Sequence, residues 1–178
     1  MEMIAHDPAM PSPAKQSLAL LGAQIAHLDG QLKEIDRRLV AQHKASAVSS
    51  RLAAVPGIGP ITALTLTLKI DPRQFESGRH FAAWLGLTPR ERSTGGRQRM
   101  GGISRAGQER VRQLLVVGAT AVIRHAKPGS KMATEWLLGL LERRPRKVAA
   151  VALANKMARI AWAMMTNETA YRRKPLAV

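Results

Sequence analysis

The chain has 178 residues, of which 46% are hydrophobic, so a packed core is possible and global disorder is not expected. It contains no cysteine, which excludes a disulfide scaffold, a thiol nucleophile and a cysteine-ligated metal site. Lys and Arg number 28 against 12 Asp and Glu, for a formal net charge of +16. This excess predicts a polyanionic partner. No uncharged apolar run is long enough to span a membrane, so we expect a cytoplasmic protein that binds DNA or RNA and no membrane.

The N-terminal quarter of the chain is predicted to be a leader followed by a coiled-coil helix. Residues 1–13 contain three prolines and no hydrophobic periodicity, which predicts a flexible leader rather than a signal peptide. Across 14–48, apolar residues recur at alternating spacings of three and four, namely Leu18, Leu21, Ile25, Leu28, Leu32, Ile35 and Leu39. The helix could pack on its own domain. The strict period favours instead a helix over 18–39 that joins two copies of the chain, or two domains.

Residues 49–166 are predicted to form a compact, mainly all-α domain, followed by a loose basic tail over 167–178. Within the domain we expect two helices joined by a tight turn over 51–70, a polar connector over 71–80, a loop over 90–102, and helices over about 104–125, 130–142 and 148–165. No strand pattern stands out, although the threonine-containing run 64–70 could be a strand.

Residues 55–64 have the pattern of a helix-hairpin-helix motif. An apolar helix end precedes the turn Gly57-Ile58-Gly59, and a second helix follows it. The two glycines would allow positive φ and close approach of the backbone to a phosphate. The unpaired N–H groups at the start of the second helix would then bind that phosphate. A tight turn without a ligand is the alternative, but the net charge favours contact with a nucleic-acid backbone.

A Gly- and Arg-rich segment over 90–105 is the candidate active-site loop. Its arginines, which could hold phosphates, are Arg90, Arg92, Arg97, Arg99 and Arg105. Ser93 and Thr94 lie among them, and a hydroxyl in this setting could attack a phosphodiester. Composition alone favours a solvated basic loop. Ser104 is expected to cap the helix that follows.

Two kinds of site are not expected. Two-metal phosphoryl transfer needs several converging carboxylates, and the aspartates Asp7, Asp29, Asp36 and Asp71 are scattered along the chain. We therefore expect no metal or other cofactor to be bound by this chain. The three tryptophans lie within apolar segments, so base-stacking platforms of the single-strand-binding kind are not expected either.

Several short motifs follow one another in a recognisable order. They are VPGIG at 55–59, FAAWLGLTPR at 81–90, STGG at 93–96 and ISRAG at 103–107, continued by segments at 112–119 and 156–162. Over about residues 18–175, their order and spacing resemble the C-terminal domain of bacterial insertion-sequence transposases of the one-ten/one-sixteen type. These are the bridge-RNA-guided serine recombinases.

The resemblance implies DNA transposition, with Ser93 as a nucleophile that forms a covalent phosphoserine link to DNA and Thr94 as a backup hydroxyl. The residues expected to bind DNA are Gly57, Ile58, Gly59, Arg90, Arg92, Thr94, Arg97, Arg99, Ser104 and Arg105. The resemblance also implies an N-terminal ribonuclease-H-like domain, which this sequence does not include. Magnesium and guide RNA are expected only through that acidic domain, so the isolated chain is expected to be inactive. The alternatives are a non-catalytic helix-hairpin-helix DNA-binding remnant and, less favoured, an RNA- or junction-binding protein.

Overall fold

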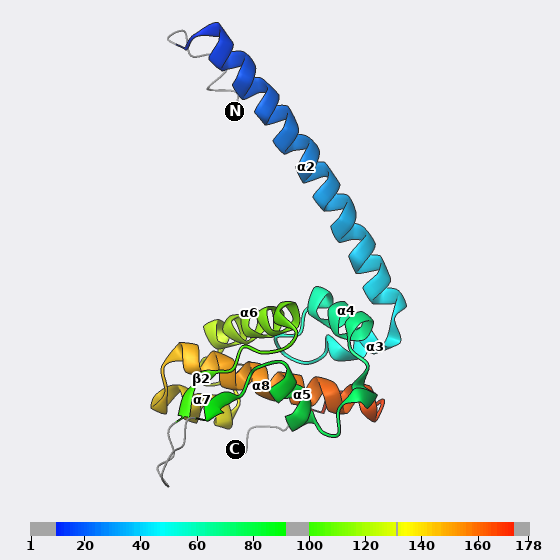
Figure 1. Ribbon diagram of the computed structural model, residues 1–178, viewed down its shortest axis with the longest axis vertical. Helices are drawn as coiled ribbons and strands as arrows, with labels where there is room; N and C mark the ends of the chain where they lie inside the picture. The colour runs from blue at the N-terminus through cyan, green and yellow to red at the C-terminus, as the bar shows by residue number, and fades with distance from the viewer. Residues whose placement is uncertain (1–9, 92–99, 131, 173–178) are drawn as a thin grey trace. The chain divides into compact units, whose positions relative to one another are not determined.

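The computed structural model describes residues 10–91, 100–130 and 132–172 (Figure 1). The chain divides into two compact units, residues 1–41 and 42–178, and each is considered by itself. The described part is mainly helical, with one two-stranded sheet, so the predicted fold class is confirmed at that level.

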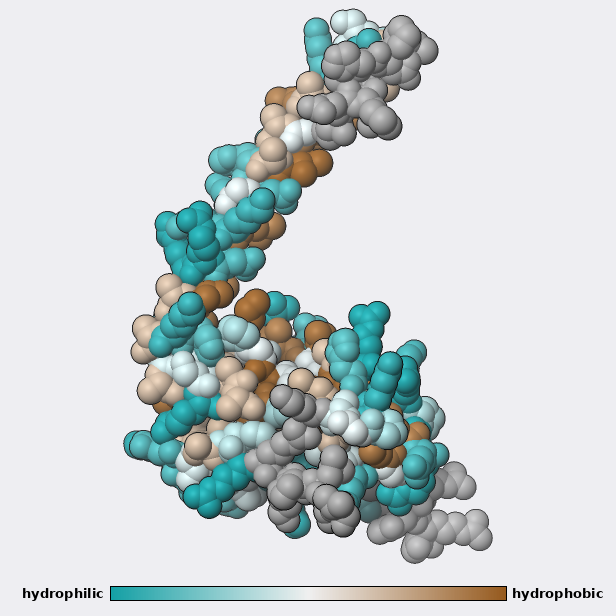
Figure 2. Space-filling model, turned by 180° about the vertical axis from the view of Figure 1, so that it is seen from behind, coloured by the Kyte–Doolittle hydropathy of each residue, from teal (hydrophilic) through white to brown (hydrophobic). Residues whose placement is uncertain are grey.

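Helix α2 (Ser12–Ala45) accounts for nearly all of the described first unit. It confirms the helix expected from the heptad pattern. None of its residues is buried, and the seam residues Leu21, Ile25, Leu28, Leu32 and Ile35 are 52% to 58% exposed. Apolar side chains recur between polar ones along this helix in the space-filling view (Figure 2). The pairing of this seam with a second helix stays a prediction.

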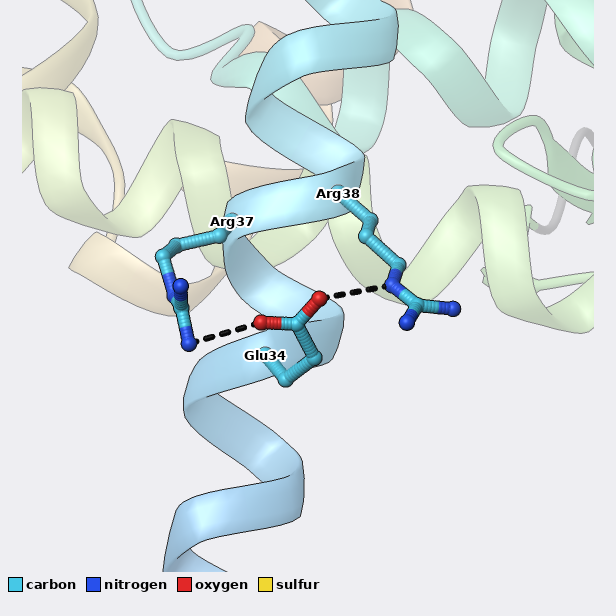
Figure 3. Close-up of polar contacts among 3 residues, drawn as sticks. All are labelled: Glu34, Arg37 and Arg38. Atoms are coloured by element: carbon cyan, nitrogen blue, oxygen red, sulfur yellow. Dashed lines mark hydrogen bonds and ion pairs between the residues drawn. The ribbon is translucent and has the colours of Figure 1, made fainter.

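Charged side chains on α2 form local ion pairs. Glu34 accepts from Arg37 at 2.6 Å and from Arg38 at 2.8 Å, at spacings of three and four residues (Figure 3). Both arginine side chains are largely in solvent and Glu34 is partly exposed, so these pairs stabilise the helix by only about 0.2–0.5 kcal/mol each. A helix of this length with no buried face therefore depends on another surface for further stabilisation.

The second unit is built around its last helix. The elements in chain order are α3 (Ala47–Leu52), α4 (Pro60–Lys69), η1 (Pro72–Gln74), α5 (Gly78–Trp84), β1 (Pro89–Glu91), β2 (Met100–Ile103), α6 (Glu109–His125), α7 (Glu135–Arg143) and α8 (Arg146–Thr166). Helix α8 packs against α3, α5, α6, α7 and η1. Its buried face consists of Ala149, Ala150, Ala154, Met157, Ala158, Ala161 and Met164, and the small side chains let neighbouring helices approach closely.

Helix α8 is also the one described helix that is long and apolar enough to cross a membrane. In the 18-residue stretch of α8 that meets this criterion, 39% of the residues are buried inside the protein. The core helix of a water-soluble domain meets the same criterion, so the composition of α8 is weak evidence for a membrane span.

Several predicted boundaries are corrected. Within the run 64–70, residues 64–69 lie in helix α4 and Ile70 is its C-cap, so the run is not a strand. The ends of the predicted loop 90–102 pair instead as antiparallel strands, with Pro89 opposite Ile103 and Glu91 opposite Met100. The predicted connector 71–80 contains η1 and the start of α5. The helix expected from about residue 130 begins at Glu135, because Thr134 accepts from the N–H of Leu137 as its N-cap.

Candidate functional site

The hairpin β1–β2 carries both ends of the Gly- and Arg-rich segment, and hydrogen bonds fix its base. The N–H of Ser104 donates to the carbonyl oxygen of Thr88 at 2.9 Å, and the N–H of Arg105 donates to that of Gly86 at 3.2 Å. The Nη2 atom of Arg90 donates to the carbonyl oxygen of Ser104 at 2.7 Å. These hydrogen bonds join residues 86–90, at the start of the hairpin, to residues 104 and 105, which follow β2.

The structure brings together part of the predicted site. Arg90 and Arg105 line one small pocket of about 260 Å³ beside Gly101, Gly102 and Ile103. The other members expected from this segment, Arg92, Ser93, Thr94, Arg97 and Arg99, lie outside the described residues. One residue of sequence separates Ser93 from Glu91, the last residue of β1. The predicted nucleophile is therefore connected directly to the hairpin.

Ser104 has a different role from the one predicted. Helix α6 begins at Glu109, with Gln108 at its N-cap, so Ser104 does not cap it. Its Oγ atom instead accepts from the N–H of Ala106 at 3.5 Å. Residues 104–107 form a turn because Arg105 has φ +56° and Gly107 has φ +67°, values that an α-helix cannot contain. The turn holds Arg105 in the left-handed region, at a cost of about 1–3 kcal/mol that the surrounding contacts must offset.

Arg112 is a structural residue of this site that the sequence analysis missed. It is 9% exposed, and its Nη1 atom donates to the carbonyl oxygens of Leu85 at 3.1 Å and Ala106 at 2.7 Å. It makes no ion pair with a carboxylate among the described residues, so the carbonyl dipoles stabilise its charge. The sequence did contain an indication of this buried position, because Arg112 lies next to Val111 on the apolar face of α6. Arg112 thereby joins the segment before β1 to the segment after β2.

Glycine is required where these two segments meet. Gly86 has φ +69°, and a Cβ atom there would collide with the backbone of Ala106. A Cβ atom on Gly107 would collide with the carbonyl oxygen of Trp84. On the other side, the Nδ2 atom of Asn155 donates to the carbonyl oxygen of Leu87 at 3.2 Å. Side chains of helices α6 and α8 therefore both hydrogen-bond to residues 85–87, the segment that leads into β1.

The turn between α3 and α4 only partly matches its prediction. Gly57 has the expected positive φ of +91°, but the prediction for Gly59 is wrong, because its φ is −80°. Gly57 faces the core, where a Cβ atom would lie 2.8 Å from the Cε atom of Met157. Ile58 is 2% exposed and belongs to the core. These two positions therefore serve packing.

Gly59 is the exposed residue of this turn and the N-cap of α4, with Pro60 at the first helical position. No side chain hydrogen-bonds to this helix end within the described residues. The N–H groups of the first turn of α4 are therefore available to an anion.

Acidic and histidine side chains do not gather at this site. Among the residues that the structure describes, no three His, Asp or Glu side chains lie close enough to hold a metal ion. The guanidinium groups of Arg90 and Arg105 at the base of the hairpin suit binding of phosphate.

Comparisons with known proteins show which proteins this chain is similar to. Residues 49–134 match the model of the transposase IS116/IS110/IS902 family. The chain is 50% identical over 174 residues to a provisionally named transposase of Sinorhizobium fredii, y4pF/y4sB, covering 97% of this chain and 45% of that protein. It is 46% identical over 172 residues to a provisionally named family 20 transposase of Pseudomonas aeruginosa, covering 96% of this chain and 51% of that protein.

A third relative is the transposase for insertion sequence element IS1111A of Coxiella burnetii. It is 37% identical over 159 residues, which cover 89% of this chain and 44% of the relative. The matched region contains the α3–α4 turn, the hairpin and helix α6, so this part of the chain resembles the transposase domain that the family model describes. The chain spans about half the length of the curated relatives that it matches.

Proposed function

We propose that this chain is the catalytic-serine and DNA-binding part of an insertion-sequence transposase, with Ser93 as its nucleophile. The observation that carries the proposal is the arrangement at the base of the hairpin. Arg90, on β1, and Arg105, two residues after β2, line one pocket there, and the two strands lead directly into the segment containing Ser93. The family match includes this whole segment.

The proposed step is a transesterification. The Oγ atom of Ser93 forms a bond to a DNA phosphorus while the bond from that phosphorus to a deoxyribose oxygen breaks, and the freed hydroxyl takes up a proton. The number of phosphate ester bonds does not change, so the step can be reversed onto a new strand. Guanidinium groups at the hairpin, Arg90 and Arg105 among the described ones, would stabilise the negative charge on the phosphoryl oxygens.

Other parts of the surface would hold the rest of the DNA. The open N-terminus of α4 at Gly59 fits a phosphate of a flanking duplex, and such a contact positions the duplex without reading its sequence. The acidic residues that hold magnesium, and the surface that binds guide RNA, would come from the other half of the transposase. In this scheme the protein acts on DNA in the cytoplasm, near the nucleoid.

Assembly of the active form would use helix α2. Its exposed apolar seam is typical of a helix that pairs with a second copy. Pairing through residues 18–39 would place two serine domains in one complex, which strand exchange between two DNA sites requires.

The second candidate function is DNA binding without chemistry. The open end of α4 favours it, because the contact that it predicts does not depend on Ser93 or on a second domain. The two functions separate in a trapping experiment with nicked duplex DNA, the N-terminal half of a full-length relative, guide RNA and magnesium. A catalytic domain gives a protein–DNA adduct that survives denaturant and is lost in Ser93→Ala, whereas the binding module gives salt-sensitive binding and no adduct.

A further inference from the structure

A long groove lies between the hairpin and the solvent-facing side of α8. Its lining comes from the start of α5, the hairpin, the start of α7 and the length of α8. The volume is about 1340 Å³, which exceeds the roughly 300–1,000 Å³ of a small-molecule pocket. The groove therefore has room for a segment of a polymer.

The charge of this groove has one sign. Five basic side chains line it, namely Arg79, Arg105, Lys147, Lys156 and Arg159, and no Asp or Glu does. Within the described residues, Arg79, Arg105, Lys147 and Arg159 make no ion pair. Arg146 and Lys147 also occupy the first turn of α8, where the helix dipole disfavours cations. A negatively charged ligand bound beside Lys147 would offset this unfavourable interaction.

The floor of the groove is apolar. It includes Leu87, Val151 and Ile160, which lie beside the cations. Trp136 is 40% exposed at the same surface, and the Nζ atom of Lys156 lies 4.1 Å from its ring centroid. Trp136 is thus accessible at this surface, although it lies within an apolar segment of the sequence.

We infer that this groove binds a single strand of nucleic acid, with phosphates along its basic rim and unstacked bases on Trp136 and the apolar floor. In a duplex the bases stack on one another and their faces are not available to the protein. The apolar floor of the groove would then contact phosphates and would gain no stabilisation from stacking. In a single strand each base offers an apolar face that stacks on an aromatic ring. The inference rests on the proposed function in one respect. Arg105 belongs both to the groove and to the hairpin, so the strand would be one that separates from the duplex beside the reacting phosphate.

The test uses the 178-residue chain and a fluorescein-labelled oligothymidine, with a duplex of equal length for comparison. The double variant Lys147→Gln with Arg159→Gln removes two cations from the groove. The matched control, Arg110→Gln with Arg124→Gln, removes two exposed cations from α6 outside it. The groove variant should bind the single strand about tenfold more weakly, and its salt slope should fall by about 1.4 for two lost phosphate contacts. The control should keep most of its affinity for the single strand.

Trp136 supplies an independent readout. Trp136→Ala should weaken binding of the oligothymidine about fivefold or more, and Trp136→Phe should restore much of it. Stacking should also quench tryptophan emission in the parent chain, and Trp136→Phe should lose most of that quenching. A lost charge elsewhere on the protein would not reproduce this pattern.

Two results would overturn the inference. One is equal loss of single-strand affinity in the groove variant and the α6 control. The other is wild-type single-strand binding by Trp136→Ala and the groove variant, which would leave an acidic protein segment as the better occupant. The proposed function fails separately, if the Ser93-dependent adduct is absent while the groove variants still lose single-strand affinity.

Discussion

Gly57 and Gly118 are in direct backbone contact, and a Cβ atom on Gly118 would overlap the carbonyl oxygen of Gly57. This contact seats the turn between α3 and α4 on helix α6, the helix that also carries Arg112. The surface that we propose to grip duplex DNA and the base of the hairpin are thus fastened to the same helix. The positions of both depend on the packing of α6.

Gly118→Ala should therefore lower the free energy of unfolding by about 2 kcal/mol, because backbone atoms must move to admit the methyl group. Urea unfolding followed by circular dichroism measures the change. Gly139→Ala in α7 is the matched control, since nothing lies within 4 Å of the added Cβ atom. The control should be neutral or raise stability by up to about 1 kcal/mol. Equal stability of the two variants would contradict the packing described here.

Arg112→Met should lower the free energy of unfolding by about 2–4 kcal/mol, because it leaves the carbonyl oxygens of Leu85 and Ala106 without their donor. Hydrogen exchange should accelerate at the N–H groups of Ser104 and Arg105, which close the base of the hairpin. Arg110→Met, at an exposed position on the same helix, should change stability by less than about 0.5 kcal/mol. Unchanged exchange at Ser104 in Arg112→Met would show that the hairpin base does not need this side chain.

Gly59→Asp should affect stability and DNA binding in opposite directions. Asp is a better N-cap than Gly, and a Cβ atom at this position meets nothing within 4 Å, so stability should rise by a few tenths of a kcal/mol. Duplex affinity should fall several-fold because the carboxylate repels a phosphate at the same N–H groups. Gly59→Asn supplies the cap without the charge and should retain more affinity. Equal duplex affinity in both variants would remove this helix end from the DNA-binding surface.

Leu28→Lys should shift the chain to a smaller species in sedimentation velocity. It places a charge in the middle of the apolar seam, where Leu28 is 52% exposed in the single chain. Ala23→Lys adds the same charge on the side of the helix opposite the seam and should leave the sedimentation coefficient unchanged. A wild-type chain that is already monomeric at high concentration would refute pairing through α2.

The sequence alone was sufficient to predict the elements that hydrophobic periodicity defines. The spacing of Leu21, Ile25 and Leu28 marks helix α2 because one face of a helix repeats every seven residues. The hairpin was missed because its strands are short, and Gly101 and Gly102 give no alternation of apolar and polar side chains. Ser104 was misread as a helix cap for a related reason, since the positive φ of the non-glycine residue Arg105 has no sequence signature.

The candidate site was only partly predictable. The basic character of Arg90 and Arg105 follows from composition, but their meeting in one pocket depends on strand pairing. The roles of Gly57 and Arg112 come from contacts with residues far away in sequence, namely Gly118 for the one and Leu85 for the other. Such contacts are set by tertiary packing, which a single sequence does not encode in a readable pattern. The exposure of Trp136 beside Lys156 was missed for the same reason.

The most direct test of the central claim locates the covalent bond itself. The chain is reacted with nicked duplex DNA in the presence of the N-terminal half of the relative, guide RNA and magnesium. The adduct is then digested with nuclease and trypsin. Trypsin releases residues 93–97 and 100–105 as separate peptides, so tandem mass spectrometry distinguishes Ser93 and Thr94 from Ser104. The account predicts a nucleotide remnant on Ser93 and its absence in Ser93→Ala. A remnant on Ser104, or an adduct that persists in Ser93→Ala, would contradict it.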